Sequence, residues 1–337
     1  MEWIRSGLFP GCVAGLWEKG RWQWRFVAGH ALVVPVRLRM RWRTLFDVAS
    51  LTKPLVTARR VLAGAGKDWD LNEPLSSFRM GKRVRLINLL NHTAGFRDWV
   101  PLYLIHNDPT ERFFYLSEAP ELRPHLRPEA LYSCLDFQWL GLWLQRNGHF
   151  PQPGKNLIKN GKGRALFAPP RRLRHQIAGT ELWRTYEKTK AAALGFETSH
   201  YSYDQHPNWG QVHDLNAFTL PRGVAGNAGL FADADGIVQL ARWWCRPSDA
   251  RRWHPRLPWE MASPDGSYGL GWQLGIPGLP ETRDRWLFHS GFTGVCIAVE
   301  PVKQQIWIFL TNRIHPEVRD VPMNTLRREL FLASFSH

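Results

Sequence analysis

Residues 46–55 read FDVASLTKPL, a stretch that sets a serine and a lysine three positions apart at the head of an apolar run. Ser50 could simply cap a helix, with Lys53 a solvated side chain on its first turn. Alternatively, the two residues are a nucleophile and its base, because residues three apart on a helix lie on one face. Pro54 is best tolerated in a first turn, so the helix is predicted to begin close to Ser50.

The composition is that of a large globular chain. Of its 337 residues 44% are hydrophobic, enough for one big domain or two lobes. It contains no run of about 18 apolar residues, so we expect no membrane span. The N-terminal segment has charge within its first five residues and no apolar core with a cleavage site, which predicts a cytoplasmic protein. The cysteines are scattered, as expected of reduced thiols: Cys12, Cys134, Cys245 and Cys296.

The net charge of +15 raises the possibility of a nucleic-acid partner. Two basic clusters stand out, RLRMRWR at 37–43 and RRLRH at 171–175. Other arginines are spread along the chain, and no zinc-finger spacing, RNP-like aromatic motif or helix-turn-helix signature accompanies them. We therefore expect no specific nucleic-acid partner, only the nonspecific attraction that charge provides.

Strand-like runs lie at both ends of the chain. Residues 12–32 predict a hairpin that turns at Glu18-Lys19-Gly20. Residues 268–312 contain three further strand-like runs, and an amphipathic stretch follows at 321–335. The middle carries helical patches between proline-rich and polar loops, and residues 151–175 look irregular.

This arrangement predicts an α+β fold with one domain over residues 1–337. An antiparallel sheet built from the N- and C-terminal segments would be flanked by helices, with a mainly helical lobe inserted. The α/β lobe is expected over about 1–75 and 225–337 and the helical lobe over about 76–224. The cleft between two such lobes is the natural place for a site.

A serine three residues before a lysine is a weak signal by itself, but three further stretches accompany it. They are LINLLNHTAGF at 86–96, Tyr132-Ser133-Cys134 in LYSCLDFQWLG, and His289-Ser290-Gly291 in FHSGFTG. With these motifs, in this order and rough spacing, the chain resembles the serine β-lactamase-related hydrolases. That superfamily includes class C β-lactamases, DD-peptidases and esterases built on the same fold. Residues 212–244 also resemble a long stretch of the family.

The resemblance implies roles for the matching residues. Ser50 would be the nucleophile, and burial together with a helix N-terminus would lower the pKa of Lys53 so that its amine can act as a base. Tyr132 would share that proton and pass it to the leaving group. Backbone N–H groups of Ser50 and Phe292 would form the oxyanion hole.

The same resemblance places substrate-binding residues around the nucleophile. Cys134 would face the substrate from the tyrosine motif. His289, Ser290 and Gly291 would line the opposite wall on an edge strand, where Gly291 lets a substrate approach the backbone.

Two other stretches could suggest a metal or a cofactor. The run HYSYDQHPNWGQVHD at 200–214 contains His200, His206 and His213, but their spacings match no common ligand pattern and the family uses no metal. We expect His213 and Asp214 to hold a loop beside the cleft. GVAGNAG at 223–229 lacks the strand-to-helix context of a dinucleotide site, so it predicts close backbone packing. No cofactor or metal is expected.

The chain departs from the family in three places. Cys134 stands where lactamases and peptidases usually carry an asparagine that donates to the substrate, and a thiol is a feeble donor. His289 replaces a lysine whose permanent charge holds a β-lactam carboxylate. The irregular residues 151–175 stand where relatives usually have a longer helical section.

Three functions remain open. The first is a serine hydrolase that acts on a small ester or amide through a Ser50 acyl-enzyme, with Lys53 and Tyr132 as base pair, most simply a carboxylic-ester hydrolase. The second is a β-lactamase or D-Ala-D-Ala-type peptidase, which would need export. The third is a catalytically weak binding protein on the same fold, or a basic protein associated with nucleic acid.

Overall fold

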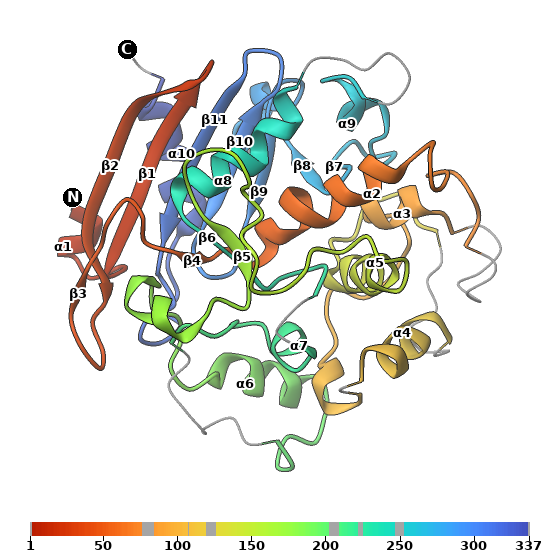
Figure 1. The fold of residues 1–337 in the computed structure, drawn as a ribbon, viewed down its shortest axis with the longest axis horizontal. Coiled ribbons are helices and arrows are strands. Elements are labelled where there is room, and N and C mark those ends of the chain that lie inside the picture. Colours follow the sequence, from red (N-terminus) through yellow and green to blue (C-terminus); the bar gives the residue numbers. More distant parts are fainter. Residues whose placement is uncertain are drawn as a thin grey trace.

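The structure, a computed structural model, describes residues 2–75, 84–106, 108–118, 126–201, 209–221, 225–246 and 253–335. Figure 1 shows a large sheet on one side and a group of helices on the other. The predicted α+β fold is confirmed. Among the described residues, no helix is long and apolar enough to cross a membrane.

Eight strands of the described chain form one antiparallel sheet, in which the two ends of the chain meet. The predicted hairpin is confirmed, with its turn at Lys19 and Gly20 in positive-φ conformations. Across the sheet the strands are β3 (Leu38–Arg39), β2 (Arg21–Leu32), β1 (Gly11–Glu18), β11 (Gln305–Thr311), β10 (Cys296–Glu300), β9 (Leu287–Ser290), β8 (Trp272–Leu274) and β7 (Tyr268–Gly269).

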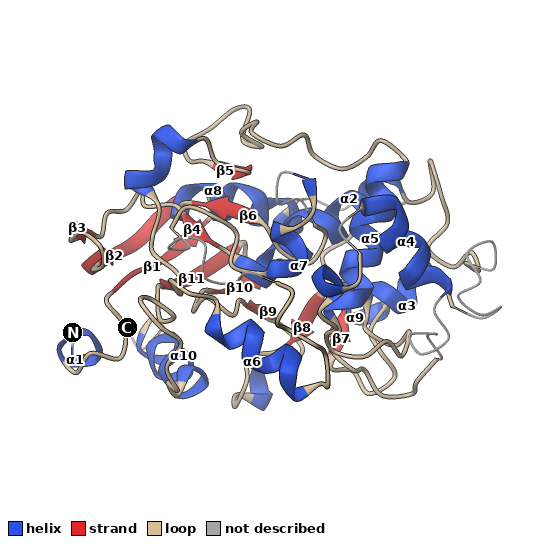
Figure 2. Cartoon of the chain, turned by 90° about the horizontal axis from the view of Figure 1, so that it is seen from below, coloured by secondary structure: helices blue, strands red, loops and turns tan. Residues whose placement is uncertain are grey.

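Both faces of the centre of this sheet are buried, and strict alternation along β11 shows why. Ile306, Ile308 and Leu310 point into one core, whereas Trp307 and Phe309 point into the other. Successive strand residues face opposite sides, so an apolar run of this length must be covered twice. Figure 2 shows α8 on one side of the sheet and α10 on the other.

The helices flank the sheet or build the second group. The α-helices are α1 (Glu2–Arg5), α2 (Arg59–Gly64), α3 (Leu86–Leu90), α4 (Pro109–Glu118), α5 (Cys134–Arg146), α6 (Thr185–Ala193), α7 (Leu215–Phe218), α8 (Ala234–Ala241), α9 (Leu257–Glu260) and α10 (Met323–Ala333). The amphipathic stretch near the C-terminus is α10, as expected.

A second, three-stranded sheet supports the nucleophile segment. It has the order β4 (Phe46–Asp47), β6 (Leu230–Ala232) and β5 (Ala165–Phe167), all antiparallel. The irregular segment 151–175 supplies β5, and a short 3₁₀ helix over Arg171–Gln176 follows it. The irregular segment therefore joins the fold through one short strand rather than through a long helix.

The helix that follows β4 begins where the sequence predicts. A 3₁₀ turn over Ala49–Leu51 runs into a π-helical stretch over Lys53–Ala58, which continues as α2. Pro54 lies in the first turn of the π-helical stretch, where its missing N–H costs no hydrogen bond. All six residues of that stretch are buried, Lys53 included.

The glycine stretch at 223–229 packs closely against a helix, as far as the structure describes it; Gly223 and Val224 lie outside the described residues. A Cβ on Gly226 would overlap the carbonyl oxygen of Phe137 in α5 and lie 2.7 Å from Gly141 Cα. The predicted close backbone packing is confirmed at Gly226.

Gly226→Ala is therefore expected to destabilise the fold by about 3 kcal/mol, because two backbones must separate to admit one methyl group. Gly148→Ala is the control, because a Cβ at this position would have open space around it. Only the φ of +72° disfavours an alanine there, and we expect a loss of about 1 kcal/mol in the free energy of unfolding. Urea unfolding of both variants measures the difference. Equal losses in the two variants would contradict the packing argument.

Candidate active site

The turn that presents Ser50 is fixed by hydrogen bonds on both sides. Ala49 has a φ of +46°, an unfavourable value for a residue with a Cβ. Its N–H donates to Asp47 Oδ1 at 2.9 Å, and its carbonyl accepts from Thr52 Oγ1 at 2.7 Å. The hydroxyl of Thr293 donates to the carbonyl of Asp47 at 2.8 Å. Surrounding structure of this kind is what holds a strained residue at a functional site.

Lys53 is fully buried, and its amine joins the residues that the sequence singled out. Nζ lies 2.9 Å from Ser50 Oγ and 2.7 Å from Tyr132 OH. It also lies 3.4 Å from the carbonyl oxygen of Asn227 and 3.5 Å from Cys134 Sγ. An ammonium has three donors, so these partners satisfy it without water.

Tyr132 is held in place by a loop that the sequence analysis noted only as a motif. Leu131 N–H donates to the carbonyl of His92 at 2.9 Å, and the His92 ring packs on the Tyr132 ring with centroids 4.9 Å apart. His92 and Asp136 were not predicted as site residues. The stretch LLNHTAG contains His92, but its partner Asp136 is 44 residues away and could not be paired with it from sequence.

His92 and Asp136 form a buried pair in which burial disfavours the charged form of each group. His92 Nδ1 lies 2.7 Å from Asp136 Oδ2 and also accepts from Ser133 N–H at 3.3 Å. Burial, then the nearby Lys53, holds the pKa of His92 well below its usual range, and burial raises the pKa of Asp136 well above its own. Together these directions favour a neutral ring, with the carboxylic O–H of Asp136 as a donor to Nδ1.

Asp136→Asn is expected to unfold in urea at nearly the wild-type midpoint, because an amide N–H can donate to Nδ1 as the carboxylic O–H does. Asp136→Ala should lose about 1–3 kcal/mol, because it leaves buried Nδ1 without this donor. If Asn costs as much as Ala, the pair is ionic and our assignment is wrong, since breaking a buried ion pair is costly in either variant.

The pKa of Lys53 moves opposite to the direction expected from sequence. Burial disfavours the ammonium form and by itself would lower the pKa of Lys53. The anionic forms of Cys134 and Tyr132, together with the hydrogen bond to Tyr132, outweigh burial and raise this pKa above its usual range. Burial also raises the pKa values of Tyr132 and Cys134, against the opposing effect of Lys53. The prediction of a lowered lysine pKa is therefore wrong, because it left out two partners 79 and 81 residues away.

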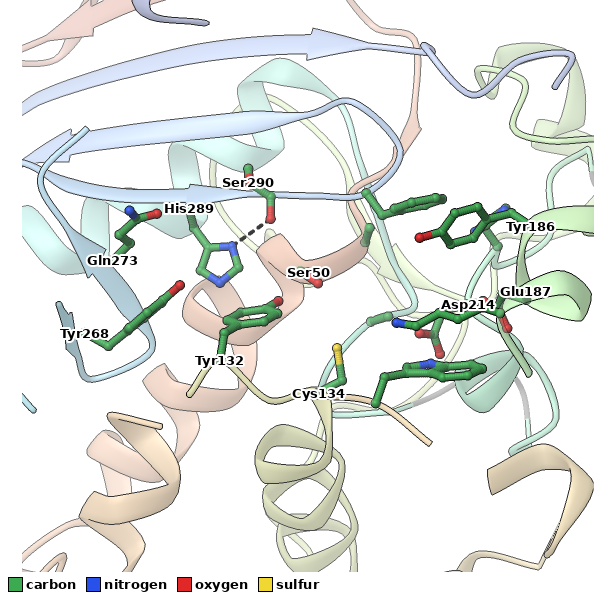
Figure 3. A pocket seen from close by; sticks show the side chains of 16 residues that line it. Ser50, Tyr132, Cys134, Tyr186, Glu187, Asp214, Tyr268, Gln273, His289 and Ser290 are labelled. Carbon is green, nitrogen blue, oxygen red and sulfur yellow. Dashed lines mark hydrogen bonds between the residues drawn. The ribbon is translucent and has the colours of Figure 1, made fainter. Parts of the chain in front are cut away.

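A cavity of about 400 Å³ opens above these groups. Figure 3 shows Ser50 between Tyr132 and Cys134 on one side and His289 and Ser290 on the other. The cavity is lined by Ala49, Ser50, Trp99, Tyr132, Cys134, Tyr186, Glu187, Lys190, His213, Asp214, Ala228, Tyr268, Gln273, His289, Ser290 and Phe292.

The third motif forms one wall, although its strand is not at the edge of the sheet as predicted. β9 pairs with β10 and with β8, but the pairing with β8 ends at Phe288, which leaves His289 and Ser290 beside the cavity. Gly291 lies behind this wall: a Cβ there would lie 2.8 Å from the carbonyl oxygen of Val48. Its small size thus lets the nucleophile turn pack against the sheet.

His289 is a neutral side chain. Burial, and then Lys53, lowers the pKa of His289 to about 3. Its Nδ1 lies 2.9 Å from the carbonyl oxygen of Ser290, so Nδ1 carries the proton and Nε2 is an acceptor. Among the described residues Nε2 has no partner. The wall therefore contains a neutral ring, not a cation.

The two groups predicted for an oxyanion hole lie beside the nucleophile. Phe292 lines the cavity, and its N–H makes no hydrogen bond within the described part of the chain. Ser50 is in the first turn of its helix, where N–H groups lack helical partners.

The far wall contains charged and aromatic residues that the sequence analysis assigned elsewhere or missed. Asp214 was expected only to hold a loop; it caps α7 through Ala217 N–H and also lines the cavity. Glu187 accepts from Leu215 N–H at 3.0 Å, and burial, then Asp214, raises its pKa well above the usual range. Lys190 lies over the Trp99 ring at 4.7 Å.

The histidine-rich run does not come together as far as it is described. His206 lies outside the described residues. His213 Nε2 lies 2.9 Å from Glu181 Oε2, and its N–H donates to Asp47 Oδ2 at 2.8 Å. His213 thus ties its loop to the strand before Ser50, as expected.

Comparisons with known proteins agree with this geometry. A family model described as Beta-lactamase matches residues 2–149 and 168–331. The chain is 26% identical to "Putative D-alanyl-D-alanine carboxypeptidase" of Salmonella gallinarum (strain 287/91 / NCTC 13346), over 85% of this chain and 73% of that protein.

Two solved structures show the same fold. "EstCE1, a hydrolase with promiscuous acyltransferase activity" aligns with a TM-score of 0.65 and 17% identity, over 92% of this chain and 91% of that one. A class C beta lactamase from Rhodobacter sphaeroides aligns with a TM-score of 0.63 and 18% identity, over 99% and 96%. The chain belongs to the β-lactamase family of serine hydrolases.

Proposed function

We propose that the chain is a carboxylic-ester hydrolase that works through an acyl-enzyme on Ser50. The observation that carries the proposal is the position of Lys53 Nζ, within 2.9 Å of the Ser50 hydroxyl and 2.7 Å of the Tyr132 hydroxyl. A serine hydroxyl becomes an effective nucleophile when a group at this distance can take its proton.

In the first step Ser50 Oγ attacks the ester carbonyl carbon, and its proton passes to the Lys53–Tyr132 pair. The N–H groups of Ser50 and Phe292 stabilise the charge that develops on the carbonyl oxygen. The C–O bond to the leaving group then breaks, and the pair returns the proton to the departing alcohol. Water then attacks the acyl carbon while the same pair takes its proton; the bond from that carbon to Ser50 Oγ breaks, and the pair returns the proton to Oγ as the acid leaves.

The raised pKa values determine how this base works. With a full complement of protons, Lys53 is an ammonium and Tyr132 a phenol, so the pair must lose one proton before it can accept that of Ser50. The base form becomes more abundant as pH rises. We therefore expect kcat/KM for ester hydrolysis to rise from neutral into alkaline pH.

The cavity favours an ester over a β-lactam. Cys134 is a neutral thiol where an amide donor would grip the substrate, and His289 is neutral where a cation would hold a carboxylate. A simple ester needs neither contact.

A peptidase acting on a peptide with a free C-terminal carboxylate is the second candidate. Lys190 lines the cavity and could supply a positive charge, although its Nζ already lies 3.6 Å from Asp98 Oδ2. The name of the Salmonella relative points the same way.

Intact-mass analysis after treatment with a fluorophosphonate tests the proposal. We expect one covalent adduct on the wild-type chain and none on Ser50→Ala. An adduct that persists on Ser50→Ala, or its absence from the folded wild type, would refute Ser50 as the nucleophile.

A further inference from the structure

The two basic clusters, at 37–43 and 171–175, form one surface. Their first residues, 37 and 171, are 134 positions apart in the sequence. In the first cluster the side chains alternate: the arginines are exposed, while the residues between them are buried or half-buried. Alternation of this kind is the period of an extended chain. We call the following residues the arginine face: Arg37, Arg39, Arg41, Arg43, Arg171, Arg172 and Arg174, all exposed.

Two neighbouring grooves join the clusters. One, of about 760 Å³, is lined by Arg39, Arg41 and Arg43 together with His175. The other, of about 880 Å³, is lined by Arg171 and Arg174, again with His175. His175 borders both grooves, so they form a continuous surface. Backbone contacts hold the clusters together: Leu45 N–H donates to the carbonyl of Gln176 at 2.8 Å.

Little within the described part of the chain neutralises this surface. No aspartate or glutamate among the described residues lines either groove. Nor does any described carboxylate form an ion pair with an arginine of the face. Two acids contact neighbours of this surface: Asp233 pairs with Arg164, which also donates to the carbonyl of Arg43, and Asp235 accepts from the indoles of Trp22 and Trp42. The arginine face is therefore a site for an anionic partner.

Exposed apolar side chains adjoin the face. Val34 and Val36, immediately before Arg37, are 42% and 44% exposed. They lie in the connection between β2 and β3, which projects from the lower left of Figure 1; Figure 2 places β3 at the same end of the molecule. Apolar residues beside arginines at a protruding loop suit the boundary between lipid headgroups and acyl chains.

We infer that the arginine face docks on an anionic lipid surface, with Val34 and Val36 entering the headgroup region. A cluster of this size is typical of proteins that bind acidic lipids. Single-stranded nucleic acid fits less well, because it needs open aromatic faces for base stacking. Trp209 is only 7% exposed and lies under Arg174, and Arg25 lies over the Trp42 ring.

Co-sedimentation with phosphatidylcholine vesicles, with and without phosphatidylglycerol, tests the inference. We expect binding only to the anionic vesicles, and its loss between about 0.1 M and about 1 M salt, where the screening length falls from about 10 Å to about 3 Å. Arg37→Glu/Arg39→Glu/Arg41→Glu should weaken binding at least about 100-fold, since each arginine contributes roughly five-fold near such a surface. Val34→Ser/Val36→Ser should also weaken it.

Arg127→Glu/Arg146→Glu/Arg285→Glu is the matched control, because it makes the same change in net charge at exposed positions away from the face. It should keep most of the binding, and ester hydrolysis reports that each variant is folded. Equal losses of vesicle binding in both triple variants would show that binding depends on net charge and not on the arginine face. The lipid assignment would be refuted if Val34→Ser/Val36→Ser bound anionic vesicles as strongly as the wild type. It would also be refuted if the protein bound a single-stranded oligonucleotide but not anionic vesicles.

Discussion

Lys53→Ala is expected to lower kcat/KM for a short-chain p-nitrophenyl ester by about 10²–10⁴-fold, the usual contribution of proton transfer. Tyr132→Phe should lower it by about 10²-fold or more, because it removes the hydroxyl 2.7 Å from Lys53 while keeping the ring that packs on His92. Since the two groups act as a unit, the double variant should lose scarcely more than the worse single variant.

The control is Thr57→Val, one turn further along the same buried helix. Thr57 Oγ1 donates to the carbonyl of Gly226 at 2.6 Å, so this variant also loses a buried hydrogen bond, but neither residue lines the cavity. It should keep ester hydrolysis within a few-fold of the wild type. Near-normal activity in both Lys53→Ala and Tyr132→Phe would remove these residues from the mechanism, and an equal loss in Thr57→Val would attribute the effect to packing.

The second large effect concerns substrate class: short-chain p-nitrophenyl esters should be hydrolysed faster than nitrocefin or penicillin. Losing one well-made hydrogen bond to a substrate costs about 1–3 kcal/mol, or roughly 5- to 150-fold in kcat/KM. A β-lactam loses two such contacts here, at Cys134 and His289. An ester that carries neither group loses none.

The preference should hold at both pH 6 and pH 8. Because the pKa of His289 is lowered to about 3, its ring stays neutral at either value and attracts no carboxylate. Cys134→Asn should raise the ratio of nitrocefin to ester turnover, since an amide N–H replaces the thiol. Nitrocefin turnover above ester turnover at both pH values would favour the lactamase function instead.

Features that depend on neighbours in sequence were predictable. The hairpin at 12–32, the strands near the C-terminus and the helix start at Ser50 all follow from alternation, turn residues and Pro54. The motif order also named Ser50, Lys53 and Tyr132 before their distances were known. The roles assigned to them stay predictions.

Features that depend on distant partners were not predictable. The pKa of Lys53 is set by Cys134 and Tyr132, which local reasoning about burial leaves out. The proton shared by His92 and Asp136 requires knowing that the two side chains meet. That the basic clusters at 37–43 and 171–175 lie together also depends on the fold, in which the two grooves that they line share His175.

The position of β11 between β1 and β10 has a consequence for biosynthesis. Cys12 pairs with Thr311, so the centre of the sheet joins segments about 300 residues apart. At about 5–20 residues per second, roughly 15–60 s separate the synthesis of these two strands. Until β11 emerges, β1 in the hairpin has an unpaired edge, and its side chains, buried on both faces in the folded sheet, are uncovered. Such long-range pairing slows folding and leaves a nascent chain open to aggregation, so a chaperone that shields the hairpin would raise the yield of folded protein.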